Sequence, residues 1–71
     1  MNPLLFSREG EQVCVIGIDA HSDTKMRLES LGFVRDAPVR VVSFSKGNLI
    51  VEIKGSRIAL DASTAAAISV A

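Results

Sequence analysis

The chain has 71 residues, of which 48% are hydrophobic and 23% charged, and its eight basic residues balance its eight acidic ones. One cysteine rules out an internal disulfide, and one cysteine with one histidine cannot supply a Cys/His zinc cage. The zero net charge argues against nucleic-acid binding, and the absence of Trp and Tyr removes the usual residues of base-stacking and polyproline-binding surfaces. Composition therefore favours a small binding module over an enzyme, with one domain over residues 1–71.

The first ten residues contain a short apolar stretch, Pro3 to Phe6. They lack the basic start and the longer apolar run of a signal peptide. No segment approaches the roughly 20 apolar residues of a membrane helix. We therefore expect a cytoplasmic protein that does not insert into a membrane, and the unpaired cysteine agrees with a reducing compartment.

The first strong element is a strand over residues 11–18. Both of its faces carry apolar residues, so we expect it to be substantially buried. Cys14, in the middle of this strand, is expected to be a small buried hydrophobic residue rather than a reactive thiol.

A short helix follows the strand. Ser22 or Asp23 can act as its N-cap, and Gly32 supplies a left-handed residue at its end, where Phe33 is placed to contact Leu28 in a Schellman motif. About ten residues are too few for a stable isolated helix, so this one must pack against the rest of the domain.

The second half of the chain predicts β-structure. Residues 39–44, 49–54 and 57–60 read as antiparallel strands joined by turns at 45–48 and 55–56. Asp61 can cap a helical turn over 62–67, and residues 68–70 form a closing strand. Short strands this close in sequence protect their edges best by curling into a small barrel, so the predicted fold class is mainly β.

Several segments together match the pattern of one known protein family. The sequence Lys-Met-Arg-Leu-Glu-Ser-Leu-Gly-Phe at residues 25–33 resembles the family pattern of a basic residue, a leucine pair and Leu-Gly-Leu at the helix end. Gly-Ser-Arg-Ile-Ala-Leu at 55–60 is similar to the family segment Gly-x-Arg-(Leu/Ile)-Ala-Leu. The order and spacing of these motifs over nearly the whole chain carry the resemblance. Further matches are residues 10–13 with Ile18 in the opening strand, the Val-rich strand at 39–42, Gly47-Asn48 where the family usually has Gly-Asp, and the ending at 66–70. Together these segments resemble the FeoA family.

The resemblance implies an SH3-like barrel with one short helix inserted after the first long strand and a helical turn before the last strand. It also implies a non-catalytic cytosolic accessory protein of bacterial ferrous iron uptake, which modulates the GTP-binding domain of a FeoB-type membrane transporter by protein–protein contact. Two segments depart from the family pattern. Arg35-Asp36 stand where Pro-Gly is usual, and the Pro-Leu-Gly-Asp-Pro loop is here residues 44–49, which lack both prolines and the acid.

The alternative role is a metal-sensing SH3-like regulatory domain, because the same fold ends the chain of some iron- or manganese-dependent repressors. Such a domain needs a separate DNA-binding part, since this chain has neither a DNA-reading helix nor a basic face. Self-association is left open by the sequence.

The predicted partner surface combines the helix with the tip of the hairpin. Apolar helix positions spread around the circumference, so part of this surface stays exposed, and arginines flank it. Hairpin tips are frequent sites of recognition. The predicted residues are Met26, Arg27, Leu28, Leu31, Phe33, Arg35, Lys46, Gly47 and Asn48.

A metal site is predicted just before the helix. Asp19, His21 and Asp23 alternate along the chain and could offer oxygen and nitrogen ligands to ferrous iron or another divalent transition metal. The competing interpretation is a solvated loop that caps the helix. No catalytic residue is predicted, because the adjacent Ser22, His21 and Asp23 cannot adopt triad geometry and no phosphate-binding loop is present.

Overall fold

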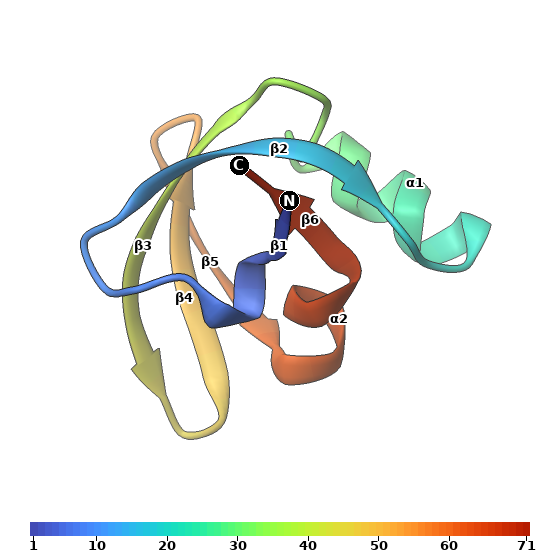
Figure 1. Ribbon diagram of the computed structural model, residues 1–71. Helices are drawn as coiled ribbons and strands as arrows, with labels where there is room; N and C mark the ends of the chain where they lie inside the picture. The colour runs from blue at the N-terminus through green and yellow to red at the C-terminus, as the bar shows by residue number, and fades with distance from the viewer.

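The computed structural model describes residues 1–71 and contains six strands, two α-helices and one short 3₁₀ helix. The strands form one antiparallel sheet in the order β1-β6-β2-β3-β4-β5, which curls around the core (Figure 1). The terminal strands β1 and β5 do not pair, so the predicted small barrel is present but open between them. The elements are β1 (Asn2–Pro3), η1 (Leu4–Phe6), β2 (Gln12–Ile18), α1 (Ser22–Ser30), β3 (Pro38–Ser45), β4 (Asn48–Ile53), β5 (Ser56–Asp61), α2 (Ala62–Ala67) and β6 (Ile68–Val70).

Two tight turns set the register of the β3-β4-β5 meander. Lys46 and Gly47 both have positive φ, at 54° and 81°, and the pair after β4, Lys54 and Gly55, has φ of 50° and 78°. Two consecutive residues of positive φ are the requirement of the two-residue hairpin turn that matches strand twist. The predicted hairpins are thus confirmed, with strand ends within one residue of those expected.

Fifteen buried hydrophobic residues form the core, and they come from every part of the chain. The predicted inward face of β4, with Leu49, Val51 and Ile53, is confirmed, because all three are buried. Leu4 is also fully buried, on the 3₁₀ helix η1 that packs against α2 and β6. The sequence predicts no helix or strand in this N-terminal segment, because three apolar residues are too short a run to show a period.

The prediction that both faces of β2 are buried is wrong. Val13 and Val15 point into the core, whereas Cys14 is exposed and Ile16 and Ile18 are only partly buried. The reason is geometric: a sheet that curls around a single core buries one face, and successive side chains point to opposite faces. Cys14 is therefore a surface thiol and not a core residue.

The predicted cap of α2 is confirmed. The Asp61 carboxylate accepts hydrogen bonds from the Thr64 backbone N–H at 2.8 Å and from the Ser63 hydroxyl at 3.1 Å. Hydrogen bonds from Thr64, with a further one from Ser63, lower the pKa of Asp61 from its ordinary value. The cap fixes the start of α2, and α2 links β5, at one end of the sheet, to β6, which lies next to the strand at the other end. Neither α-helix is long and apolar enough to cross a membrane.

Candidate interaction surface

The helix α1 is anchored to the barrel by residues at its C-terminal end. Gly32, at φ 112°, donates its N–H to the Glu29 carbonyl, and the Phe33 N–H bonds to the Leu28 carbonyl, both at 3.0 Å. These are the two hydrogen bonds of a Schellman motif, which brings Leu28 and Phe33 together. Leu28 is 1% exposed and Phe33 0%, so both belong to the core. The predicted helix end is confirmed, and these two residues of the predicted partner surface are unavailable to a partner.

The start of α1 differs from the prediction. His21 occupies the N-cap position, with no side-chain hydrogen bond to the helix, and Ser22 is already the first helical residue. Ser22 and Asp23 therefore do not act as the N-cap. Asp23 lies in the first turn, where its negative charge faces the positive end of the helix dipole.

Three apolar side chains of α1 and the residues after it remain exposed. Met26 is 66% exposed, Leu31 is 42% exposed, and Val34, which is not among the predicted surface residues, is also 42% exposed. Met26 lies two residues before the buried Leu28, about 200° away around the helix, so it points away from the barrel. Leu31 instead lies beside β5, where it helps to line a hollow of about 170 Å³. In Figure 1, α1 stands out from the side of the barrel. Because Met26 and Leu31 are both exposed, α1 presents apolar residues in more than one direction.

The two arginines of the predicted surface have different surroundings. Arg27 is exposed and lines the hollow between α1 and β5. Arg35 is exposed as well, but its Nη1 donates a hydrogen bond of 3.2 Å to the Ile16 carbonyl of β2. Arg35 therefore ties the segment after α1 to the barrel, while Arg27 is free of such a bond.

The hairpin tip is separate from α1. Lys46 and Gly47 form the exposed turn between β3 and β4, and Asn48 is partly buried opposite Ser45. Phe44, near the same end, is 47% exposed, and its N–H donates to a Glu9 carboxylate oxygen at 3.3 Å. Figure 1 shows this tip and α1 at opposite ends of the molecule. The structure thus separates the predicted partner surface into two regions.

The predicted metal ligands are all exposed and lie along the segment that joins β2 to α1. Asp19 follows the end of β2, His21 is the N-cap of α1, and Asp23 is in its first turn. The chain contains no group of three or more His, Cys, Asp or Glu side chains arranged to hold a metal ion. The change from strand to helix turns consecutive side chains in different directions, so alternate positions here do not share one face. These three residues are not brought together into a ligand set.

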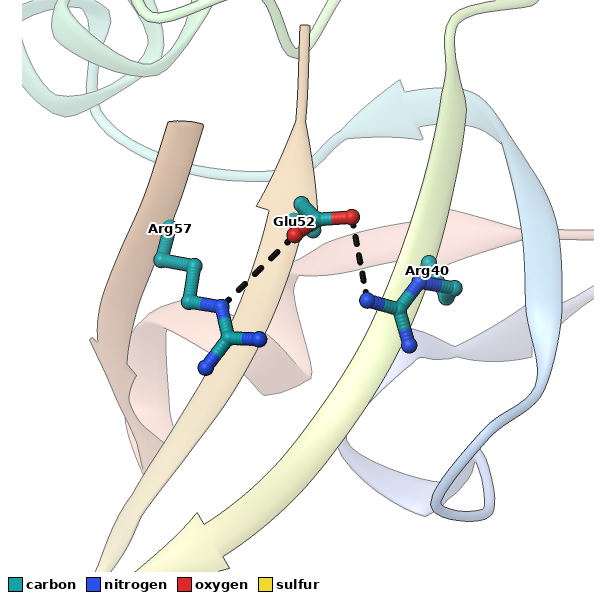
Figure 2. A network of polar contacts seen from close by, with 3 residues as sticks. All are labelled: Arg40, Glu52 and Arg57. Carbon is teal, nitrogen blue, oxygen red and sulfur yellow. Dashed lines mark hydrogen bonds and ion pairs between the residues drawn. The ribbon is translucent and has the colours of Figure 1, made fainter. Parts of the chain in front are cut away.

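A cross-strand ion network lies on the outer face of the sheet and was not predicted. Glu52 on β4 pairs with Arg40 on β3 at 3.0 Å and with Arg57 on β5 at 3.6 Å (Figure 2). These residues face each other in the register Arg40↔Glu52 and Glu52↔Arg57. The hydrogen bond from Arg40 lowers the pKa of Glu52 from its ordinary value. The turn lengths, which set this register, are the sequence signal that could have found it.

Comparison with known proteins identifies the family. A family model described as FeoA domain matches residues 2–71. A protein assigned as Fe(2+) transport protein A in Methanocaldococcus jannaschii is 40% identical over 60 residues, which are 84% of this chain and 73% of that protein.

Solved structures show the same fold. The crystal structure of an iron uptake regulatory protein, FeoA, has a TM-score of 0.88 and 26% identity and covers 99% of this chain and 93% of that one. FeoA of Stenotrophomonas maltophilia complexed with zinc, described as a prokaryotic SH3 domain protein, has a TM-score of 0.85 and 28% identity and covers 96% of this chain and 87% of that one. The predicted SH3-like fold is confirmed.

A manganese-dependent transcriptional repressor, in complex with manganese, is also similar, with a TM-score of 0.88 and 28% identity. The match covers 99% of this chain but 35% of the repressor, so the likeness is to one part of that protein. The family model, by contrast, matches almost the full chain. The protein therefore belongs to the FeoA family, as its sequence motifs predicted.

Proposed function

We propose that this protein is a non-catalytic, cytoplasmic accessory subunit that modulates the GTP-binding domain of a FeoB-type transporter by direct contact through α1. The observation that carries the proposal is the position of α1, which is anchored at Leu28 and Phe33 but exposes Met26 and Leu31. Exposed apolar side chains on a protruding element are a common property of protein-binding surfaces.

The shape and composition of α1 favour a groove as its binding site on the partner. A helix that is exposed on several sides offers its apolar residues best to a groove that encloses it. Arg27, next to Met26, adds a long side chain of the type enriched at interface hot spots. We therefore assign the principal contacts to Met26, Arg27 and Leu31, with Val34 at the margin.

A titration monitored by NMR tests this proposal. The ¹⁵N-labelled protein is titrated with the transporter's cytosolic GTP-binding domain, separately with GDP and with a non-hydrolysable GTP analogue. We expect the largest shift changes at residues 26–34. Absence of changes there in both nucleotide states, at partner concentrations well above those of the labelled protein, would rule out α1 as the contact.

Matched variants distinguish α1 from other exposed apolar surface. Met26→Ser is expected to weaken binding about fivefold or more, as truncation of an interface anchor does. Phe6→Ser removes another exposed apolar side chain, on η1, and is expected to leave the affinity unchanged. Lys46→Glu tests whether the hairpin tip, with Gly47 and Asn48, makes a second contact. Equal effects of Met26→Ser and Phe6→Ser would show that binding does not depend on α1.

A second candidate function is a metal-sensing regulatory domain, and the similarity to the manganese-dependent repressor supports it. In that case ferrous iron or another divalent transition metal would bind near Asp19, His21 and Asp23 once the joining segment rearranged. Anaerobic titration with Fe²⁺ or Mn²⁺, followed by the melting temperature, tests this role. If metal raised the melting temperature of the wild type and His21→Ala abolished this increase, the result would support the metal-sensing role.

A further inference from the structure

The outer edge of β5 has no partner strand. β5 pairs with β4 alone, and the two-residue turn makes Ile53 and Ser56 the closing pair of the hairpin. Residues along an antiparallel strand point their N–H and C=O groups alternately toward the neighbouring strand and away from it. Counting from Ser56, the groups of Arg57 and Ala59 point away from β4, and neither residue bonds to another backbone segment. Figure 2 shows Arg57 on this edge strand, with β4 beside it.

We propose that β5 pairs in antiparallel fashion with β5 of a second copy of the chain, with Ala59 at the two-fold axis. Arg57 and Asp61 lie two residues to either side of Ala59. In this register, Arg57 of each copy therefore lies directly opposite Asp61 of the other, on the outer face of the sheet. Asp61 caps α2 through Oδ1 and Arg57 contacts Glu52 through Nε, so the Asp61 Oδ2 and the Arg57 Nη groups remain for this pair. Opposite charges at directly facing positions stabilise a strand pair, whereas like charges there destabilise it.

The backbone of Ala59 suits the centre of such a pair. Two Ala59 residues facing each other would exchange both of their outward N–H···O=C bonds. The Ala59 side chain is exposed on the outer face of the sheet, so it does not lie between the two backbones. A register shifted by one residue would place each Arg57 opposite a residue other than Asp61. It would also align outer-face side chains of one copy with inner-face side chains of the other. The charge pairing and the alternation of side chains therefore favour the same register.

The inner side of the seam is apolar. Ile58 and Leu60 would face each other across the two copies, and Ile58 is only partly buried within one chain. The hollow of about 170 Å³ along this side of β5 is lined mainly by apolar residues, among them the 42% exposed Leu31. The seam thus combines charge pairs outside with apolar contact inside.

A second copy fits this edge better than an unrelated strand does. An interface on a two-fold axis must be self-complementary: if one residue contacts a second residue of the other copy, that second residue contacts the first one in return. The arrangement of Arg57 and Asp61 about Ala59 meets that condition within one strand. Arg27 and Leu31 line the hollow beside β5 and also belong to the proposed transporter surface. Met26 does not line this hollow, so Met26→Ser distinguishes the two contacts.

Analytical ultracentrifugation over a concentration series tests the proposal, with variants at position 59. For the wild type, the mean mass should rise toward twice that of the monomer as concentration increases. Ala59→Pro removes only an N–H that points away from β4, and edge strands tolerate proline in this orientation, so its fold should remain while dimerisation is lost. Ala59→Thr retains the N–H and should dimerise as the wild type does. Circular dichroism checks that each variant is folded.

A charge variant keeps the test valid if Ala59→Pro does not fold. Arg57→Asp places two carboxylates opposite each other and should weaken dimerisation at least tenfold, whereas Arg57→Lys should weaken it far less. The charge effect should decrease at high salt, because the pair is exposed. A wild type that stays monomeric, or Ala59→Pro and Arg57→Asp variants that dimerise like the wild type, would overturn the proposal. Loss of the dimer through Met26→Ser alone would overturn it as well, since the contact would then lie on α1.

Discussion

The attachment of α1 to the barrel makes a quantitative prediction for Leu28→Ala. Leu28 is 1% exposed and is the only residue within α1 that is buried, so it anchors the helix together with Phe33 beyond the helix end. Replacing a buried leucine with alanine destabilises proteins by about 2–5 kcal/mol, depending on how far the site can collapse. Because α1 stands out from the barrel and can move inward, we expect a value near the lower limit, about 2–3 kcal/mol.

That loss is large for a domain of this size. A chain of 71 residues, at about 0.05–0.15 kcal/mol per residue, has a predicted free energy of unfolding of roughly 4–11 kcal/mol. Leu28→Ala should therefore remove between a fifth and most of the stability. Met26→Ala is the matched control, because Met26 lies on the same helix but is 66% exposed, and surface substitutions usually change stability by less than about 0.5 kcal/mol.

Urea unfolding followed by circular dichroism measures both variants, since the chain has no Trp or Tyr to report by fluorescence. The expected result is a lower midpoint for Leu28→Ala and an unchanged midpoint for Met26→Ala. If the two variants differed from each other by less than about 0.5 kcal/mol, the inference that Leu28 anchors α1 to the core would be refuted.

Three further predictions concern the N-terminal segment, the helix end and the ion network. Leu4→Ala should destabilise the domain by about 2–5 kcal/mol. Phe6 is 75% exposed on the same 3₁₀ helix, so Phe6→Ala should change the free energy of unfolding little. Urea unfolding compares the two variants, and equal effects would mean that η1 is not part of the core. Gly32→Ala should lower the free energy of unfolding by more than about 1 kcal/mol, because φ is 112° and the added Cβ would lie 3.2 Å from Lys54 Cδ. In the control variant Gly17→Ala, the added Cβ meets no atom within 4 Å. If urea unfolding found Gly32→Ala as stable as Gly17→Ala, the left-handed helix end would be contradicted. The lowered pKa of Glu52 contributes stability that is present above the ordinary pKa of the carboxyl and is lost as pH falls through the lowered value. Acid should therefore destabilise the wild type more than it destabilises Glu52→Gln. Thermal melts at about pH 7 and pH 3 compare the two proteins, and equal losses of melting temperature would show that this network does not contribute.

The strands of the second half were predictable because local chemistry decides them. Positive-φ turns at Lys46-Gly47 and Lys54-Gly55 leave little choice of register, and β-branched residues alternate between them. The Schellman motif at Gly32 and the Asp61 cap were predictable for the same reason, since each needs only residues within one turn. The family resemblance followed from the order of these same local motifs.

The candidate surface was predictable only in part. Hydrophobic content alone cannot say which apolar residues of a short helix pack inward, and so Leu28 and Phe33 were grouped with Met26 and Leu31. Cys14 was misplaced because apolar residues on both faces of β2 indicate burial of both faces, whereas the curled sheet has one core. The metal site at Asp19, His21 and Asp23 was predicted from the alternate spacing of these residues. Spacing alone does not say where side chains point when a strand changes to a helix, and the structure does not bring the three together.

The sequence by itself determined strands β2 to β6, the turns of the β3-β4-β5 meander, the C-terminal end of α1, the cap of α2 and the family, because those features depend on neighbours along the chain. Only the tertiary structure decided which face of β2 is solvent-exposed, that Leu4 completes the core, and that α1 and the hairpin tip lie at opposite ends of the molecule. It also decided that β5 is an edge strand on which Arg57, Ala59 and Asp61 face outward. The physical reason is that burial and pairing depend on segments far apart in sequence, which meet only when the sheet closes around its core.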